Sequence, residues 1–147
     1  SAASDVYKRQ VYEFKPMLKS KNLQCNLCVD DDIMLRCDAD KIQRVFDNLL
    51  RNAVIYSFEN TDITISAQCH EDTVSIIFCN HGDTLPEEKL NRIFEQFYRL
   101  DAARSTSSGG AGLGLAIVKQ IVELHNGTIV AESQEEQNKF SITLPLA

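Results

Sequence analysis

Four of the six glycines in this chain of 147 residues lie between positions 109 and 114. A small polar run, 105–108, precedes this glycine cluster, and an apolar run with helical spacing, 115–124, follows it. The first turn of a helix has unpaired backbone N–H groups, and glycine lets a ligand approach them closely. The cluster therefore has two interpretations that it cannot separate alone: a phosphate cradle, or a flexible loop before a core helix.

The first third of the chain predicts a helix, a pair of strands and a second helix. Residues 6–21 have helical periodicity, and Pro16 is expected to kink this run or to start a separate short helix. Alternation predicts a strand over 23–29, followed by an acidic hairpin turn at 30–32 and a returning strand over 33–37. Asp38 is the expected N-cap of a long helix over 39–57.

The rest of the chain continues the alternation of strand pairs and helices. The expected elements are strands over 62–69 and 73–79, a short helix over 86–93, a loop over 99–111, a helix over 112–125, and strands over 128–133 and 140–144 around a polar hairpin, 134–139. This order predicts one domain over 1–147 in the α+β class. It would be a two-layer sandwich with a mixed sheet of about five strands covered on one face by three helices.

Composition argues against several kinds of function. The net charge of −6 does not suit a nucleic-acid surface, which needs a basic face. No stretch approaches the ~20 apolar residues of a membrane span, and residues 1–5 lack the features of a signal peptide. Cys25 and Cys28 would point to opposite faces of a strand, so we expect neither a metal site nor a redox site there.

Two further segments carry polar residues in unusual places. Asn48 and Asn52 lie four residues apart, beside the apolar face of the long helix, where they either meet ordinary partners or line a cleft. An amide oxygen in a cleft could bind Mg²⁺. The second segment, Asn80 to Pro86, follows a strand, and in isolation it could be any turn.

Taken together and in this order, these segments resemble the sequence boxes of sensor histidine kinases. Asn48 to Ala53 with Tyr56-Ser57 resembles the N box, Asn80 to Pro86 the G1 box, Phe94 to Arg99 the F box, and Gly110 to Ile117 the G2 box. Residues 99–105 resemble the ATP lid, which we expect to be mobile over 100–111. The resemblance spans 38–147 and is greatest to the VanS-type group of Gram-positive sensor kinases.

The resemblance implies the Bergerat ATP-binding fold, and ATP with Mg²⁺ as ligands. Asn52 would then bind the Mg²⁺, with Asn48 beside it and Tyr56 near the phosphates or the sugar. Asn80 occupies the position that reads the adenine amino group. The remaining ATP contacts implied by the family come from Gly82, Thr84, Leu85, Gly110, Gly112, Leu113 and Gly114, and the lid arginines implied to neutralise phosphate charge are Arg99 and Arg104.

Three positions depart from the family pattern. Asn80 stands where the family usually has Asp, Thr84 replaces a glycine, and Ile55 replaces a Lys or Arg that reaches toward phosphate. An amide accepts a weaker hydrogen bond than a carboxylate does. These changes predict weak nucleotide affinity.

The resemblance also implies the reaction. Hydrolysing relatives carry a Glu four residues before the Mg²⁺-binding Asn; here that residue is Asn48, which is no general base, and Asp47 should point away. The acceptor would be a histidine on a separate dimerisation domain. His70, His81 and His125 lie outside the acceptor setting, so the chain alone is not expected to autophosphorylate.

The expected partners are this dimerisation domain and a downstream response regulator, with no nucleic acid and no direct membrane contact. The chain would be a monomeric cytoplasmic piece of a homodimeric protein of the bacterial cell membrane. Two alternatives remain. One is a degenerate module that binds a partner domain without using ATP, and the other is an anti-sigma-type serine kinase.

Overall fold

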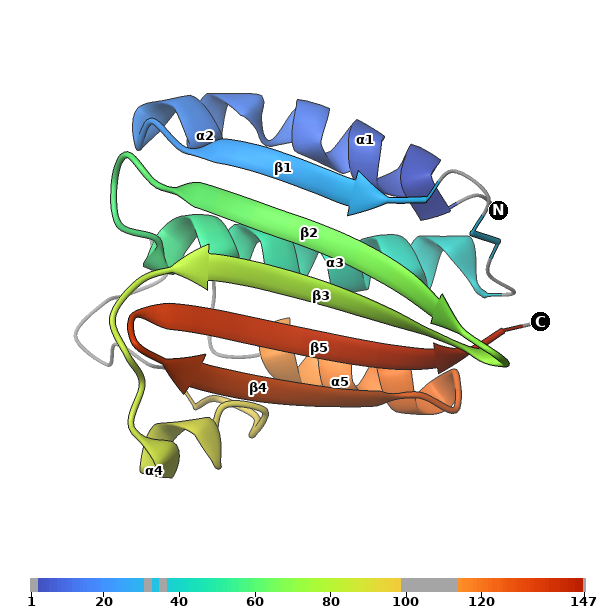
Figure 1. Ribbon diagram of the computed structural model, residues 1–147. Helices are drawn as coiled ribbons and strands as arrows, with labels where there is room; N and C mark the ends of the chain where they lie inside the picture. The colour runs from blue at the N-terminus through green and yellow to red at the C-terminus, as the bar shows by residue number, and fades with distance from the viewer. Residues whose placement is uncertain (1–2, 31–32, 35–36, 99–113, 147) are drawn as a thin grey trace.

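The computed structural model describes residues 3–30, 33–34, 37–98 and 114–146, and the structural statements below concern these residues. Its elements are, in order, α1 (Ala3–Glu13), α2 (Lys15–Ser20), β1 (Gln24–Val29), α3 (Ala39–Tyr56), β2 (Asp62–His70), β3 (Thr73–His81), α4 (Glu87–Leu90), α5 (Gly114–Leu124), β4 (Thr128–Gln134) and β5 (Gln137–Pro145). The strands form one mixed sheet in the order β1-β2-β3-β5-β4 (Figure 1). Among the strands of the described residues, only β1 and β2 pair in parallel.

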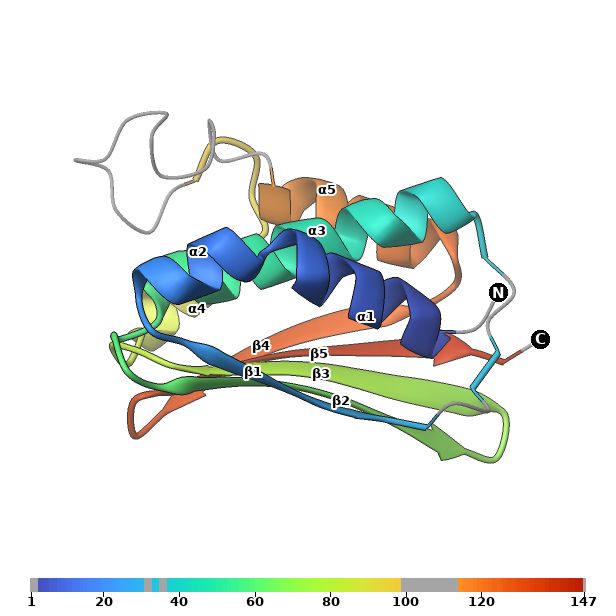
Figure 2. The same ribbon diagram turned by 90° about the horizontal axis from the view of Figure 1, so that it is seen from above.

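The helices α1, α2, α3 and α5 lie on one face of this sheet, and α4 lies at its end (Figures 1 and 2). Strict alternation makes one face of the strands apolar: along β3, for example, Val74, Ile76 and Phe78 are buried while their neighbours are only partly so. The amphipathic helix α3 packs its apolar side on that face. The predicted two-layer α+β fold with a mixed five-stranded sheet is therefore confirmed.

Both ends of α3 are capped by side chains. At its start Asp38 accepts a hydrogen bond from the Lys41 backbone N–H at 3.2 Å, as the sequence predicted. At its end the Lys21 ammonium donates to the carbonyl oxygens of Val54, Ile55 and Ser57 at 2.9, 2.7 and 3.0 Å. A cation at this end also suits the negative pole of the helix.

The N-terminal helices belong to the same core. The Tyr7 ring lies 4.5 Å, centroid to centroid, from that of Phe46 on α3. Gln10 is buried and donates to the carbonyl oxygen of Gln43 and to the carboxylate of Asp47. Of the two outcomes expected at Pro16, the structure shows a separate short helix, α2, with this proline in its first turn.

The predicted hairpin after β1 is wrong. Strand β1 pairs with β2 in parallel, from Gln24 opposite Asp62 to Val29 opposite Ala67. A parallel neighbour requires a long crossover, which α3 supplies. In place of a returning strand, Met34 forms an isolated bridge and Cys37 lies in a bend, while 31–32 and 35–36 lie outside the described residues.

The hairpin between β4 and β5 is tighter than predicted. Its turn consists of Glu135 and Glu136, which have φ values of 50° and 60°, in place of the expected loop over 134–139. Two positive φ values give the turn geometry that suits the twist of a hairpin. The polar residues 137–139 therefore extend β5 at its start, next to the functional site.

Candidate functional site

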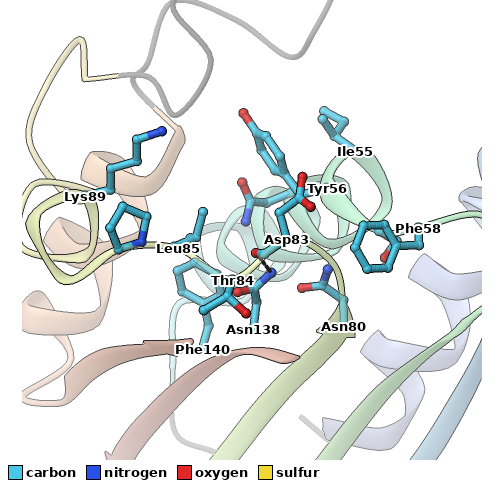
Figure 3. Close-up of a pocket in the computed structure, with 13 residues that line it drawn as sticks. Ile55, Tyr56, Phe58, Asn80, Asp83, Thr84, Leu85, Lys89, Asn138 and Phe140 are labelled. Carbon is cyan, nitrogen blue, oxygen red and sulfur yellow. Dashed lines mark hydrogen bonds between the residues drawn. The ribbon is translucent and has the colours of Figure 1, made fainter. Parts of the chain in front are cut away.

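A cavity of about 530 Å³ opens at the end of the sheet (Figure 3). Four parts of the chain contribute to it: the end of α3, the end of β3 with the segment that follows, α4, and the start of β5. The lining residues are Asn52, Ile55, Tyr56, Ser57, Phe58, Asn80, Asp83, Thr84, Leu85, Pro86, Lys89, Asn138 and Phe140. The structure thus brings together Asn52, Tyr56, Asn80, Thr84 and Leu85, which the sequence singled out as ATP contacts.

The start of α5 lies beside the same helix. A side chain on Gly114 would begin 3.3 Å from the amide oxygen of Asn48, one turn before Asn52. The last residue of the glycine cluster therefore faces one asparagine of α3, and the other asparagine lines the cavity. The first backbone N–H groups of a helix attract anions, so this junction suits phosphate.

Asn80 is buried, with only 3% of its surface exposed, yet its side-chain nitrogen has no hydrogen-bond partner among the described residues. Buried amides are nearly always hydrogen-bonded, because an unmade bond costs about 1–3 kcal/mol. The amide lies at the floor of the cavity, at the end of β3 (Figure 3). It is therefore suited to bind a polar group of a ligand.

The segment after β3, residues 82–86, is fastened to the β4–β5 hairpin. The Gly82 N–H donates to the Glu136 carbonyl at 3.0 Å, and the Glu136 N–H donates to the Thr84 hydroxyl at 2.7 Å. The Leu85 N–H donates to the Ser133 hydroxyl, also at 2.7 Å. Thr84, which stands where the resembled family has a glycine, thus binds this segment to the hairpin.

Sequence reasoning missed Ser133 and Asn138 as site residues. The Asn138 amide donates to the Asp83 carbonyl at 3.3 Å and accepts from the Ser133 hydroxyl. A signal was present: Asn138 lies two residues before Phe140, in phase with the buried face of β5. The predicted loop over 134–139 concealed it.

Few charged side chains line the cavity. The lining contains one cation, Lys89, and one carboxylate, Asp83, among the described residues. Asp47 points away from the cavity and toward α1, as predicted, where it accepts from Gln10 at 2.9 Å. Burial, with Glu13 nearby, raises the pKa of this carboxyl, while Arg51 opposes the shift. The carboxyl of Asp47 thus does not line the cavity.

Several predicted site residues lie outside the part of the chain that the structure describes: Arg99, Arg104, Gly110, Gly112, Leu113 and the proposed lid over 100–111. Within the described part, no cluster of His, Cys, Asp or Glu could hold a metal ion. Along β1, Cys25 is half-buried and Cys28 exposed, as expected for opposite faces. None of the described helices is long and apolar enough to span a membrane.

Residues 37–147 match the family model described as histidine kinase-, DNA gyrase B-, and HSP90-like ATPase. The chain is 47% identical over 133 residues to the sensor protein VanS of Enterococcus faecium, an alignment that covers 90% of this chain and 34% of VanS. It therefore spans about a third of the length of this relative. The similarity confirms the predicted resemblance to VanS-type kinases.

Solved structures show the same fold. The catalytic domain of histidine kinase ThkA, in a nucleotide-free form, has a TM-score of 0.88 and 26% identity, covering 99% of this chain and 93% of that one. ThkA in complex with the response regulator TrrA has a TM-score of 0.82 and 25% identity, covering 100% and 41%. The chain thus belongs to the histidine kinase-, DNA gyrase B- and HSP90-like ATPase family, as the catalytic ATP-binding domain of a sensor histidine kinase.

Proposed function

We propose that this chain binds ATP with Mg²⁺ in the cavity and transfers the γ-phosphoryl group to a histidine of a separate dimerisation domain in the same protein. One observation carries the proposal. Asn80, whose amide nitrogen has no hydrogen-bond partner in the described part of the chain, lines the same cavity as Asn52, while Asn48 adjoins the helix start at Gly114. Asn80 is thus suited to a nucleobase, Asn52 to a metal ion, and the helix start at Gly114 to phosphates.

Each part of the nucleotide has suitable side chains. The base would lie on Asn80, between apolar walls that include Leu85 and Phe140. The triphosphate would extend toward Asn52 and the start of α5. The Asn52 amide oxygen is a hard donor of the kind Mg²⁺ accepts, and this ion needs only one or two protein ligands beside phosphate and water. Bound there, it would neutralise the charge that develops on the phosphates.

The proposed reaction is a direct transfer. A neutral imidazole nitrogen attacks the γ-phosphorus, the bond to the β,γ-bridging oxygen breaks, ADP leaves, and the imidazole proton passes to solvent. The chain would contribute positioning and electrostatic stabilisation. Asp47 faces α1 and Asn48 is an amide, so α3 brings no base to activate water. This arrangement favours transfer over hydrolysis.

The acceptor would be supplied by another domain. His70 is exposed at the β2–β3 turn, and both ring nitrogens of His125 meet backbone groups, Ile121 O and the Asp38 N–H. The isolated chain is therefore expected not to label itself. We further propose a response regulator as the downstream partner, as in the ThkA complex, and a full-length homodimer in a bacterial membrane with this domain, a monomer when isolated, in the cytoplasm.

Labelled ATP tests the transfer. Mixed with Mg²⁺ and the dimerisation domain, the chain should place label on that domain, and Asn52→Ala should abolish the labelling. Label on the isolated chain would contradict the assignment of the acceptor. Phosphohistidine is acid-labile, so acid-stable label on serine would favour the anti-sigma-type kinase.

Calorimetry tests the alternative that the chain is a degenerate module that does not use ATP. Ile55, Asn80 and Thr84 favour this alternative because each departs from the family pattern. A non-hydrolysable ATP analogue with Mg²⁺ should produce a binding heat and raise the Tm of the chain. If millimolar analogue produced neither effect, the chain would be a module that no longer uses ATP.

A further inference from the structure

We propose that Asn80 makes this cavity accept purine nucleotides with a 6-oxo group as well as ATP. The inference rests on the proposed nucleotide-binding function and extends it from one nucleotide to a class. Its basis is the chemistry of a buried carboxamide at the place where the base would be read.

The position of Asn80 would let its side chain form hydrogen bonds with the edge of the nucleobase. Its side chain is 3% exposed and lines the cavity at the end of β3 (Figure 3). Its nitrogen has no partner among the described residues, so no donor bond fixes the orientation of the amide. A half-turn of the terminal torsion would exchange the oxygen and the nitrogen at little cost.

A carboxamide has a donor and an acceptor side by side. The edge of adenine presents a donor, the 6-amino group, next to an acceptor, N1. The edge of a 6-oxopurine presents an acceptor, O6, next to a donor, N1–H. The amide of Asn80 can form two hydrogen bonds with either edge, once in each orientation. A carboxylate in its place presents acceptors only, so it would pair with the 6-amino group and repel O6.

The neighbouring amide does not restore selectivity. Asn138 lines the same cavity, but its oxygen accepts from Ser133 and its nitrogen donates to the Asp83 carbonyl. These bonds fix its orientation, and reversing the amide would break both. Asn80 is therefore the amide that can adapt to the base.

Calorimetry with ATP and ITP on the 147-residue chain, both with Mg²⁺, tests the inference. Inosine carries the 6-oxo group but lacks the 2-amino group of guanosine, so ITP isolates the 6-position. We expect the Kd of ITP to lie within about fivefold of that of ATP, because both edges satisfy the amide. Asn80→Asp should shift the ratio of the two Kd values toward ATP by about tenfold or more, because O6 then faces an acceptor.

Asn91→Asp is the matched control, since Asn91 is exposed at the C-cap of α4 and the change adds the same charge two positions after Lys89, which lines the cavity. It should leave the ratio unchanged. ITP binding more than about 50-fold weaker than ATP would overturn the inference while the proposed function stood. An unchanged ratio in folded Asn80→Asp would overturn it as well.

If the proposed function itself is wrong, the wild-type chain binds neither ATP nor ITP. This result differs from the outcomes above, in which ATP still binds. Circular dichroism establishes whether Asn80→Asp folds. If it does not, the wild-type ratio of the Kd values for ITP and ATP decides the inference alone.

Discussion

The backbone carbonyl oxygen of Tyr56, at the end of α3, occupies the place where a side chain on Gly82 would begin. The two segments meet through their backbones, and the Phe58 N–H donates to the His81 carbonyl at 2.8 Å beside this contact. Tyr56 lines the cavity, and Gly82 begins the segment that closes it. The width of the cavity therefore depends on the absence of a side chain at position 82.

Replacing Gly82 by Ala should therefore damage both the fold and the site. The new methyl group meets backbone, which cannot rotate away, so we expect a loss of about 1–3 kcal/mol in the free energy of unfolding and a weaker affinity for ATP. Gly127→Ala is the control, because its methyl group meets the Thr143 carbonyl and neither residue lines the cavity. Urea denaturation should show a loss for both variants, whereas calorimetry should show weaker ATP binding for Gly82→Ala only.

Gly114→Ala should separate binding from stability. The methyl group would lie 3.3 Å from the Asn48 amide oxygen, so the amide has to shift by a few tenths of an ångström. Alanine suits a helix, and the free energy of unfolding should stay within about 1 kcal/mol of wild type. ATP affinity should fall by about tenfold or more, because small misplacements are costly at a phosphate site.

A double-mutant cycle checks the cause of that loss. If the clash with Asn48 is responsible, Gly114→Ala should weaken ATP binding less in an Asn48→Ala background than in wild type. Additive losses of affinity would show that Gly114 acts independently of Asn48.

Lys21→Met should destabilise the end of α3. The ammonium of Lys21 donates to three carbonyl groups there, and its loss leaves them without this partner. We expect the free energy of unfolding to fall by about 1–3 kcal/mol. Lys19→Met, the same change at an exposed position, should alter it by no more than about 0.5 kcal/mol. Equal effects of the two variants in urea denaturation would refute the capping role.

Asp47→Asn should raise stability at neutral pH without changing ATP affinity. Burial raises the pKa of Asp47 in the folded state, so the ionised form costs stability. This cost is absent below the unfolded pKa of about 3.9 and is fully present once the pH has risen through the folded pKa. The advantage of the variant should thus shrink as the pH falls from 7 toward 4 in urea denaturation. A loss of ATP binding would implicate Asp47 in the site.

Alkylation should distinguish the cysteines. Burial raises the pKa of the Cys25 thiol to about 11, so roughly a thousandth of it is ionised at pH 8. Cys28 and Cys69 are exposed. Iodoacetamide at pH 8 should label these two first, as read by peptide mass spectrometry, and Cys25 only after denaturation. Rapid labelling of Cys25 in the folded chain would contradict its burial.

The periodicity of the sequence predicted most helices and strands, because each element repeats its apolar residues along its own length. The long helix with Asp38 at its N-cap and the strands 62–69 and 73–79 needed no distant information. The prediction of a strand over 33–37 was wrong because strand pairing is not determined locally. Strand β1 pairs with β2, which follows α3 in the sequence. The prediction of a polar loop over 134–139 was too long because it interpreted the polar residues 137–139 as part of a turn, whereas they belong to β5.

The sequence by itself determined the class of the fold and the order of the motifs, since these depend on residue type and short spacing. Only the tertiary structure decided how the cavity is closed. The hairpin bonds to Asp83, Thr84 and Leu85 join residues 48 to 55 positions apart. Whether a polar side chain such as Asn138 meets solvent or Asp83 depends on that packing. That the Asn80 nitrogen meets no partner among the residues that the structure describes likewise becomes evident only once its surroundings are known.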